Sequence, residues 1–187
     1  MIANVLTLIK TLLQILLLRK GPDALPRAPV IVVAVIGLWL LSGVAVLALV
    51  DGYTSRKFLI DILLTAFALI VYALLINAAN RAERLQQALS AILGCGALLG
   101  LVLVLAESLL PKIFGAEQVQ AMVTLIWLWS LPVEAHIIAR AIDRQWYVGL
   151  LATLMVLALQ LFLLPSLGSM IDPQAQQQAE VLISEQA

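Results

Sequence analysis

The stretch VIVVAVIGLWLLSGVAVLALV, residues 30–50, contains no charged residue. A helix rises about 1.5 Å per residue, so about 20 apolar residues cross a hydrocarbon core of about 30 Å. Four more apolar stretches of similar length follow, at 58–79, 88–110, 119–139 and 146–165. We therefore predict an all-α fold: a polytopic membrane helical bundle with five transmembrane helices.

Composition supports this fold class and limits what else the chain holds. Of the 187 residues, 63% are hydrophobic and 12% are charged, which leaves too little polar surface for a soluble domain of this size. We expect three regions: an interfacial helix with a proline-rich basic linker at 1–29, the transmembrane domain at 30–165, and a polar, flexible tail at 166–187.

The basic residues predict an orientation. If the spans alternate sides, eight of the eleven basic residues share one side, and positive loops stay cytoplasmic. We therefore expect a multi-pass protein of a bacterial inner membrane, with the N-terminus cytoplasmic and the C-terminus outside. The eight are Lys10, Arg19, Lys20, Arg27, Arg81, Arg84, Arg140 and Arg144, and the other three are Arg56, Lys57 and Lys112.

Residues 2–18 have the pattern of an amphipathic helix, with apolar residues recurring at i, i+3, i+4 and i+7. A polar stripe through the middle favours a helix that lies in the membrane interface over one that spans it. A sixth span remains the alternative. A cleaved signal peptide fits less well, because no basic residue precedes Lys10. The apolar face comprises Ile2, Val5, Leu6, Ile9, Leu12, Leu13 and Leu16.

The linker RKGPDALPRAP, residues 19–29, holds three prolines and a glycine, so it breaks the helix. Its basic residues suit anionic lipid headgroups, at about 1 kcal/mol per residue near the surface. A plain positive-inside anchor is the alternative. The residues expected at the cytoplasmic headgroups are Arg19, Lys20, Arg27, Arg81, Arg84, Arg140 and Arg144.

The second span carries a polar stripe. Asp61, Thr65, Ala68 and Tyr72 follow spacings of four, three and four, which put them on one helical face. Unpaired polar groups are costly in hydrocarbon, so this face should meet other helices rather than lipid. Asp61 also lies near the outer boundary, where it can reach the interface.

The third span contains a GxxxG pair, Gly96 and Gly100, which lets a neighbouring backbone approach closely. The same face continues to Glu107. We expect this face to be a helix-packing or partner interface. Glu107 and Asp61 are predicted at similar depth, so the two carboxylates could share a proton or a cation. They could equally pair with the nearby basic residues.

The fourth span is the most polar, with Glu134 and His136 following Pro132. Glu134 lies roughly 9 Å inside the predicted cytoplasmic end, so it either bonds a residue of the fifth span or a partner, or reaches water. His136 is expected to be a hydrogen-bonded interfacial group, because no base or metal partner accompanies it.

Sequence motifs for catalysis are missing. There is no metal-ligand spacing, no phosphate-binding loop and no nucleophile elbow, so we expect no metal site, no cofactor and no enzymatic activity. The single cysteine, Cys95, cannot form an internal disulfide and should behave as a buried small hydrophobe. The zero net charge gives no reason to expect a nucleic-acid partner.

An amphipathic N-terminal helix, a proline break and five spans resemble the Yip1-type membrane proteins. The closing stretch IWLWSLPVEAHIIARAIDRQWYVGLLATLMVLAL, residues 126–159, is similar to that family's last helix pair around Trp127, Trp129, Ser130 and the 140–144 loop. The resemblance implies an integral membrane protein that acts through other membrane proteins or lipids. The resemblance does not assign a functional role to any residue of this chain.

Together these features favour a non-catalytic accessory or scaffold subunit of a larger membrane assembly. Its expected partners are other integral membrane proteins, membrane lipids or further copies of the chain. The alternative is a small transporter or channel that uses the intramembrane acids. A third hypothesis, a lipid-modifying enzyme, needs Glu134 and His136 to cooperate although they point about 200° apart on an ideal helix.

Overall fold

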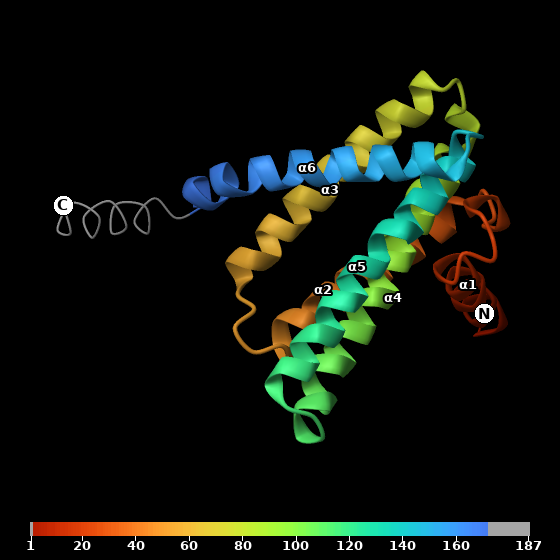
Figure 1. The fold of residues 1–187 in the computed structure, drawn as a ribbon. Coiled ribbons are helices and arrows are strands. Elements are labelled where there is room, and N and C mark those ends of the chain that lie inside the picture. Colours follow the sequence, from red (N-terminus) through yellow and green to blue (C-terminus); the bar gives the residue numbers. More distant parts are fainter. Residues whose placement is uncertain (1, 172–187) are drawn as a thin grey trace, which may run out of the picture.

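A computed structural model of the chain describes residues 2–171 and shows six α-helices within that range (Figure 1). Five of them are long and apolar enough to cross a membrane, and no strand occurs among the described residues. The predicted all-α, five-span membrane fold is confirmed. The helices are α1 (Ile2–Leu16), α2 (Pro29–Leu49), α3 (Ser55–Ala78), α4 (Leu85–Leu109), α5 (Ala116–Ala141) and α6 (Trp146–Ile171), with 3₁₀ turns η1 (Pro22–Ala24), η2 (Ala82–Arg84) and η3 (Leu110–Lys112).

Three helices, α1, α3 and α5, end at the same end of the bundle with a common cap. Leu18, Asn80 and Asp143 each adopt a left-handed backbone. The next residue, an arginine in all three cases, donates its N–H to the carbonyl five positions earlier. A cation just past a helix C-terminus also complements the helix dipole. We call the end of the bundle that carries Arg19, Arg81 and Arg144 the basic end.

The last helix is longer than predicted. It passes through Pro165 and continues to Ile171, so the predicted boundary at 165 is wrong and residues 166–171 belong to α6. Proline is tolerated inside membrane helices when other groups satisfy the backbone that it frees. Beyond the proline, the carbonyl of Gly168 accepts a hydrogen bond from Arg56 of α3. The rest of the predicted tail, 172–187, lies outside the described residues.

The helices form two groups that meet at the basic end and diverge from it. Helices α2, α4 and α5 run together, while α6 turns away from α5 and crosses α3 beside them (Figure 1). Half of the α4 span is buried inside the protein, against at most 22% of any other span. Helix α4 is therefore the centre of the bundle.

Glycines allow the closest helix contacts. The position of a Cβ on Gly94 of α4 is occupied by the side chain of Leu12 from α1. A Cβ on Gly100 would likewise meet Ser42 of α2. At the start of α6, Gly149 lies against the carbonyl of Ala135 in α5. Each glycine admits a neighbour that a side chain would exclude.

The N-terminal helix is docked on its own chain. Leu12 and Ile15 are fully buried against α4 and α5. Cys95 Sγ donates to the Leu12 carbonyl at 3.7 Å, and Trp129 Nε1 donates to the Leu16 carbonyl at 3.2 Å. With 15 residues, α1 is too short to span a membrane, and part of its predicted lipid-facing surface is covered by protein.

Replacing Gly94 by leucine should displace α1, because the new side chain would occupy the space of Leu12. Cys95 lies beneath α1 and is 2% exposed, so the rate at which its thiol is modified reports whether α1 is displaced. We expect N-ethylmaleimide to modify Cys95 at least several-fold faster in detergent-solubilised Gly94→Leu protein than in the wild type. Gly96→Leu is the matched control, since the nearest atom to that Cβ position is 3.9 Å away. Equal rates in all three proteins would show that α1 is not held at Gly94.

Candidate functional site

A polar cluster lies where the two groups of helices meet. Tyr72 of α3 donates its hydroxyl hydrogen to Glu134 Oε2 of α5 at 2.7 Å. Tyr72 is fully buried and Glu134 is partly buried. A carboxylate inside a membrane protein is costly unless another group bonds it, and the phenol meets that requirement. The hydrogen bond ties α3 to α5.

Two further side chains border this pair. Thr153 of α6 is 1% exposed, and its hydroxyl lies near that of Tyr72 without forming a hydrogen bond of good geometry. Cys95 of α4 belongs to the same buried core as Tyr72, together with Val133 of α5 and Val156 of α6. Four helices therefore converge here. The sequence predicts that Glu134 either bonds the fifth span or a partner, or reaches water, and the structure shows a bond to Tyr72 of the second span.

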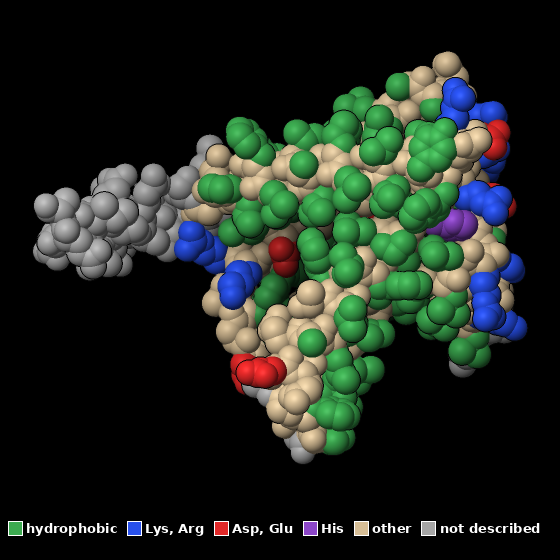
Figure 2. All heavy atoms as spheres, viewed as in Figure 1, with side chains coloured by type: hydrophobic (Ala, Val, Ile, Leu, Met, Phe, Trp, Pro, Cys, Tyr) green, Lys and Arg blue, Asp and Glu red, His purple; other side chains and the backbone are tan. Residues whose placement is uncertain are grey.

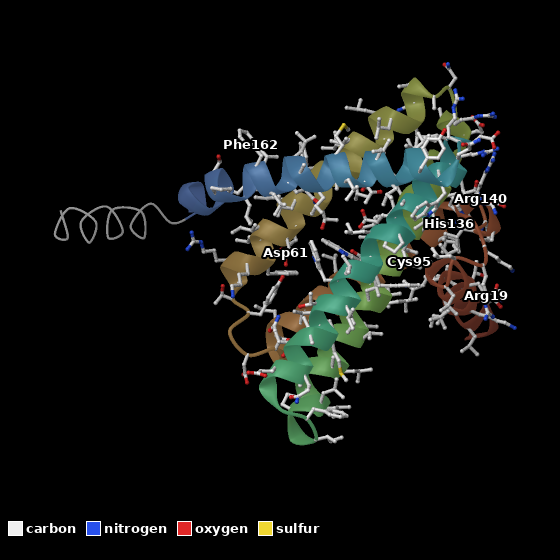
Figure 3. The ribbon with its side chains drawn as sticks, viewed as in Figure 1. Arg19, Asp61, Cys95, His136, Arg140 and Phe162 are labelled. Atoms are coloured by element: carbon white, nitrogen blue, oxygen red, sulfur yellow. The ribbon has the colours of Figure 1, made fainter. Side chains whose placement is uncertain are left out.

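The predicted polar stripe of α3 is covered at one end and open at the other. Ala68 and Tyr72 are buried, Thr65 is partly buried and Asp61 is exposed. Figure 3 shows Asp61 on the side of α3 that faces the space between the two groups of helices. In Figure 2 the surface is hollowed here, with an acidic side chain inside the hollow. This space is called the lateral cleft below.

Asp61 is bonded within the cleft by Tyr53, from the loop between α2 and α3. The Tyr53 hydroxyl donates to Asp61 Oδ2. Burial, and then the bond to the Asp61 carboxylate, raise the pKa of Tyr53 above its ordinary value, so the phenol stays protonated and remains a donor. No sequence motif points to Tyr53, which is marked only by its position just before the second span.

Two alternatives were open for Asp61 and Glu107, a shared site or pairs with nearby cations, and the hydrogen bonds and ion pairs of the described residues include neither. Tyr53 is the hydrogen-bond partner of Asp61, and Glu107 makes no hydrogen bond or ion pair with any described residue. The nearby cations bond backbone instead: Arg56 donates to the carbonyl of Gly168, and Lys57 Nζ donates to that of Gly52 at 2.8 Å.

The GxxxG face of α4 packs on α2 of the same chain. Gly100 lies against Ser42, which is buried, and Trp39 is the nearest side chain to Gly96. The helix that packs on this face at Gly100 is therefore α2 of the same chain. Gly96 itself remains exposed beside it.

His136 and Glu134 have separate surroundings. His136 Nε2 donates to the carbonyl of Lys20 at 3.1 Å, on the side of α5 that faces the linker. Glu134 faces Tyr72 of α3 instead. This separation agrees with their angular spacing on the helix, and the structure does not bring the two side chains together.

The basic linker is clamped by a glutamine that sequence analysis missed. Gln87 of α4 is buried and donates to the carbonyls of Leu25 and Asp23, at 2.5 and 3.3 Å. It also accepts from Arg27 Nε at 3.1 Å. A polar residue near the boundary of a span is common, so the sequence gives no sign of this contact.

The predicted cytoplasmic cations gather at the basic end, where Figure 2 shows Lys and Arg side chains around the histidine. Arg81 pairs with Asp143 at 3.0 Å and lies 3.9 Å from Glu83. Arg84 Nη1 donates to the carbonyl of Arg140 at 2.8 Å. These bonds join the two loops of this end.

No described group of His, Cys, Asp and Glu side chains is arranged to hold a metal ion. Comparison with models of known protein families, with curated proteins and with solved structures finds no match to this chain.

Tyr72→Phe should lower stability by about 1 kcal/mol, because it leaves Glu134 without its bond partner inside the membrane domain. Glu134→Gln should cost less, since the amide oxygen still accepts from Tyr72. Unfolding in mixed micelles measures both, and the double variant gives the coupling energy. Strictly additive losses would mean that the two side chains do not interact.

Proposed function

We propose that this protein is a non-catalytic accessory or scaffold subunit of a larger assembly in a bacterial inner membrane. In this proposal the basic end is cytoplasmic and the C-terminus lies outside, as the positive-inside rule implies. The supporting observation is the lateral cleft, where the outer part of the α3 stripe is left uncovered by the chain's own helices.

Contact between the lateral cleft and lipid acyl chains is energetically unfavourable. Asp61 is exposed within a membrane-spanning helix, and its one hydrogen-bond partner among the described residues is the phenol of Tyr53. Ionisable side chains in spans face protein or water rather than acyl chains. A helix from another membrane protein, or from a second copy, would cover Asp61 and Thr65.

The attachment of α3 and α6 suits a surface that receives a partner. Among the described contacts, Gln160 of α6 donates to the carbonyl of Leu64 in α3 at 3.1 Å, and Arg56 bonds Gly168. These bonds join α3 and α6 to each other. The pair is joined to α5 by the Tyr72–Glu134 hydrogen bond and by the packing of α6 on α5.

The resemblance to Yip1-type proteins belongs to the same proposal. Its support is the order of elements: a docked amphipathic helix, a proline-rich break and five spans. A protein of this kind acts by holding other membrane components rather than by transforming a substrate.

The same stripe favours one alternative, a small proton or cation transporter. Asp61, Thr65 and Tyr72 lead from the open side of the cleft to Glu134. Buried Ala68 interrupts the polar groups, so a transport path requires α3 to move. The scaffold proposal requires no such motion.

Site-specific crosslinking tests the scaffold proposal. In a Cys95→Ala background, we expect Thr65→Cys to crosslink to another polypeptide in native membranes, since Thr65 lines the cleft. Ile70→Cys is the control, because Ile70 lies on α3 and is 60% exposed on another face. Asp61→Asn should reduce the Thr65 crosslink. Equal labelling at both positions, or crosslinks to lipid alone, would count against a partner in the cleft.

A flux assay separates the two functions. The scaffold proposal predicts that proteoliposomes show no proton flux above that of empty vesicles, followed with an internal pH dye. A flux that disappears in both Asp61→Asn and Glu134→Gln would instead establish the transporter.

A further inference from the structure

A second concave surface lies on the far side of α5 from Glu134. It is an open groove of about 370 Å³ between α5 and α6, lined almost wholly by apolar atoms. Its walls lie inside two membrane-spanning helices, so an acyl chain is the group that reaches it from the bilayer. The lining residues are Leu125, Leu128, Trp129, Leu131, Pro132, Trp146 and Leu150.

The groove leads toward the basic end. Pro132, His136 and Arg140 follow one another at spacings of four on α5, which places them on one face. Arg140 is exposed, and Arg144 lies two residues before Trp146, which lines the groove. Positive charge therefore stands where the groove meets the membrane boundary.

The end of α1 adds to this charge. Trp129, in the groove wall, donates to the carbonyl of Leu16. Arg19 and Lys20 follow directly, both exposed, and the carbonyl of Lys20 is bonded by His136. The linker is thereby held beside Arg140, whose side chain lies next to Gly21.

The structure divides the basic residues into two classes. Arg27, Arg81 and Arg84 bond protein groups, namely Gln87, Asp143 and the carbonyl of Arg140. The side chains of Arg19, Lys20, Arg140 and Arg144 make no ion pair with any described carboxylate. The second class is therefore the one that can offer its charge to an anionic headgroup.

We propose that this surface is a binding site for an anionic phospholipid of the surrounding bilayer. One acyl chain lies along the groove, and the phosphate is held by Arg140 and Arg144 with Arg19 and Lys20 nearby. The apolar acyl chain matches the apolar lining of the groove, and the anionic headgroup matches the unpaired cations. Trp146 stands at the start of its span, where tryptophan favours the membrane interface. The inference does not depend on a partner in the lateral cleft.

Native mass spectrometry of the full chain in detergent tests the site, with phosphatidylglycerol and phosphatidylcholine of identical acyl chains. We expect phosphatidylglycerol to bind several-fold more tightly. Arg140→Gln with Arg144→Gln should weaken it about tenfold or more, since two headgroup contacts are lost. Arg81→Gln with Arg84→Gln removes the same charge and should change binding less than twofold, with thermal unfolding used to verify its fold. Equal losses in both pairs would reduce the effect to bulk charge and overturn the site.

A second pair of variants tests whether the acyl chain lies in the groove. Leu128→Trp puts bulk into the lining and should weaken phosphatidylglycerol about as much as loss of the arginines. Leu151→Trp places the same bulk on an exposed part of α6 outside the groove and should have no effect. Inorganic phosphate should not compete, because it lacks the chain. Binding that survives Leu128→Trp, or that phosphate displaces, would contradict the proposal.

Discussion

Close packing on the small residues of α4 is the interaction on which the bundle depends. In lipid no hydrophobic effect drives helices together, so association relies on van der Waals contact and on hydrogen bonds. Gly94 admits Leu12 of α1 and Gly100 admits Ser42 of α2, which fixes one neighbour on each of two faces. Gly149 does the same between α6 and the backbone of α5 at Ala135. These contacts explain why α4 is the most buried span and why α1 is attached to the bundle at all.

Helix α3 is held differently, and the lateral cleft follows from that difference. It contains no glycine, and its buried residues, Ala68, Tyr72 and Ile76, all lie in its second half. Hydrogen bonds also link it to other helices: Tyr72 to Glu134, the Leu64 carbonyl to Gln160, and Arg56 to Gly168. Hydrogen bonds fix points along a helix, whereas small-residue packing joins whole faces. A helix fixed at a few points can diverge from its neighbours, and the polar stripe is left partly open.

Local properties made the five spans and the sidedness of charge predictable, because both depend on residues close together in the chain. Neighbours in space were not predictable in the same way. Hydropathy shows that Glu134 needs a partner but not that the partner is Tyr72, because hydropathy does not encode which helix packs against α5 at that point. Gln87 and Thr153 carry no motif, and their roles depend on which backbone or hydroxyl faces them. Proline breaks helices in water, which is why the sequence predicts an end at 165, but a membrane helix tolerates Pro165.

Helix α5 separates the two surfaces that carry the proposals. Positions two apart on a helix point in nearly opposite directions, so Glu134 faces the α3–α6 side while His136 faces the linker and the groove. Pro132 stands in the groove wall, one turn from His136 and only two residues before Glu134. One short segment thus bonds a neighbouring helix on one side and lines a lipid-accessible groove on the other. Most of the described residues lie in these helices, so surfaces within the membrane are the main ones that the described part of the chain offers to other molecules. In the two proposals, the two sides of α5 divide that contact between protein and lipid.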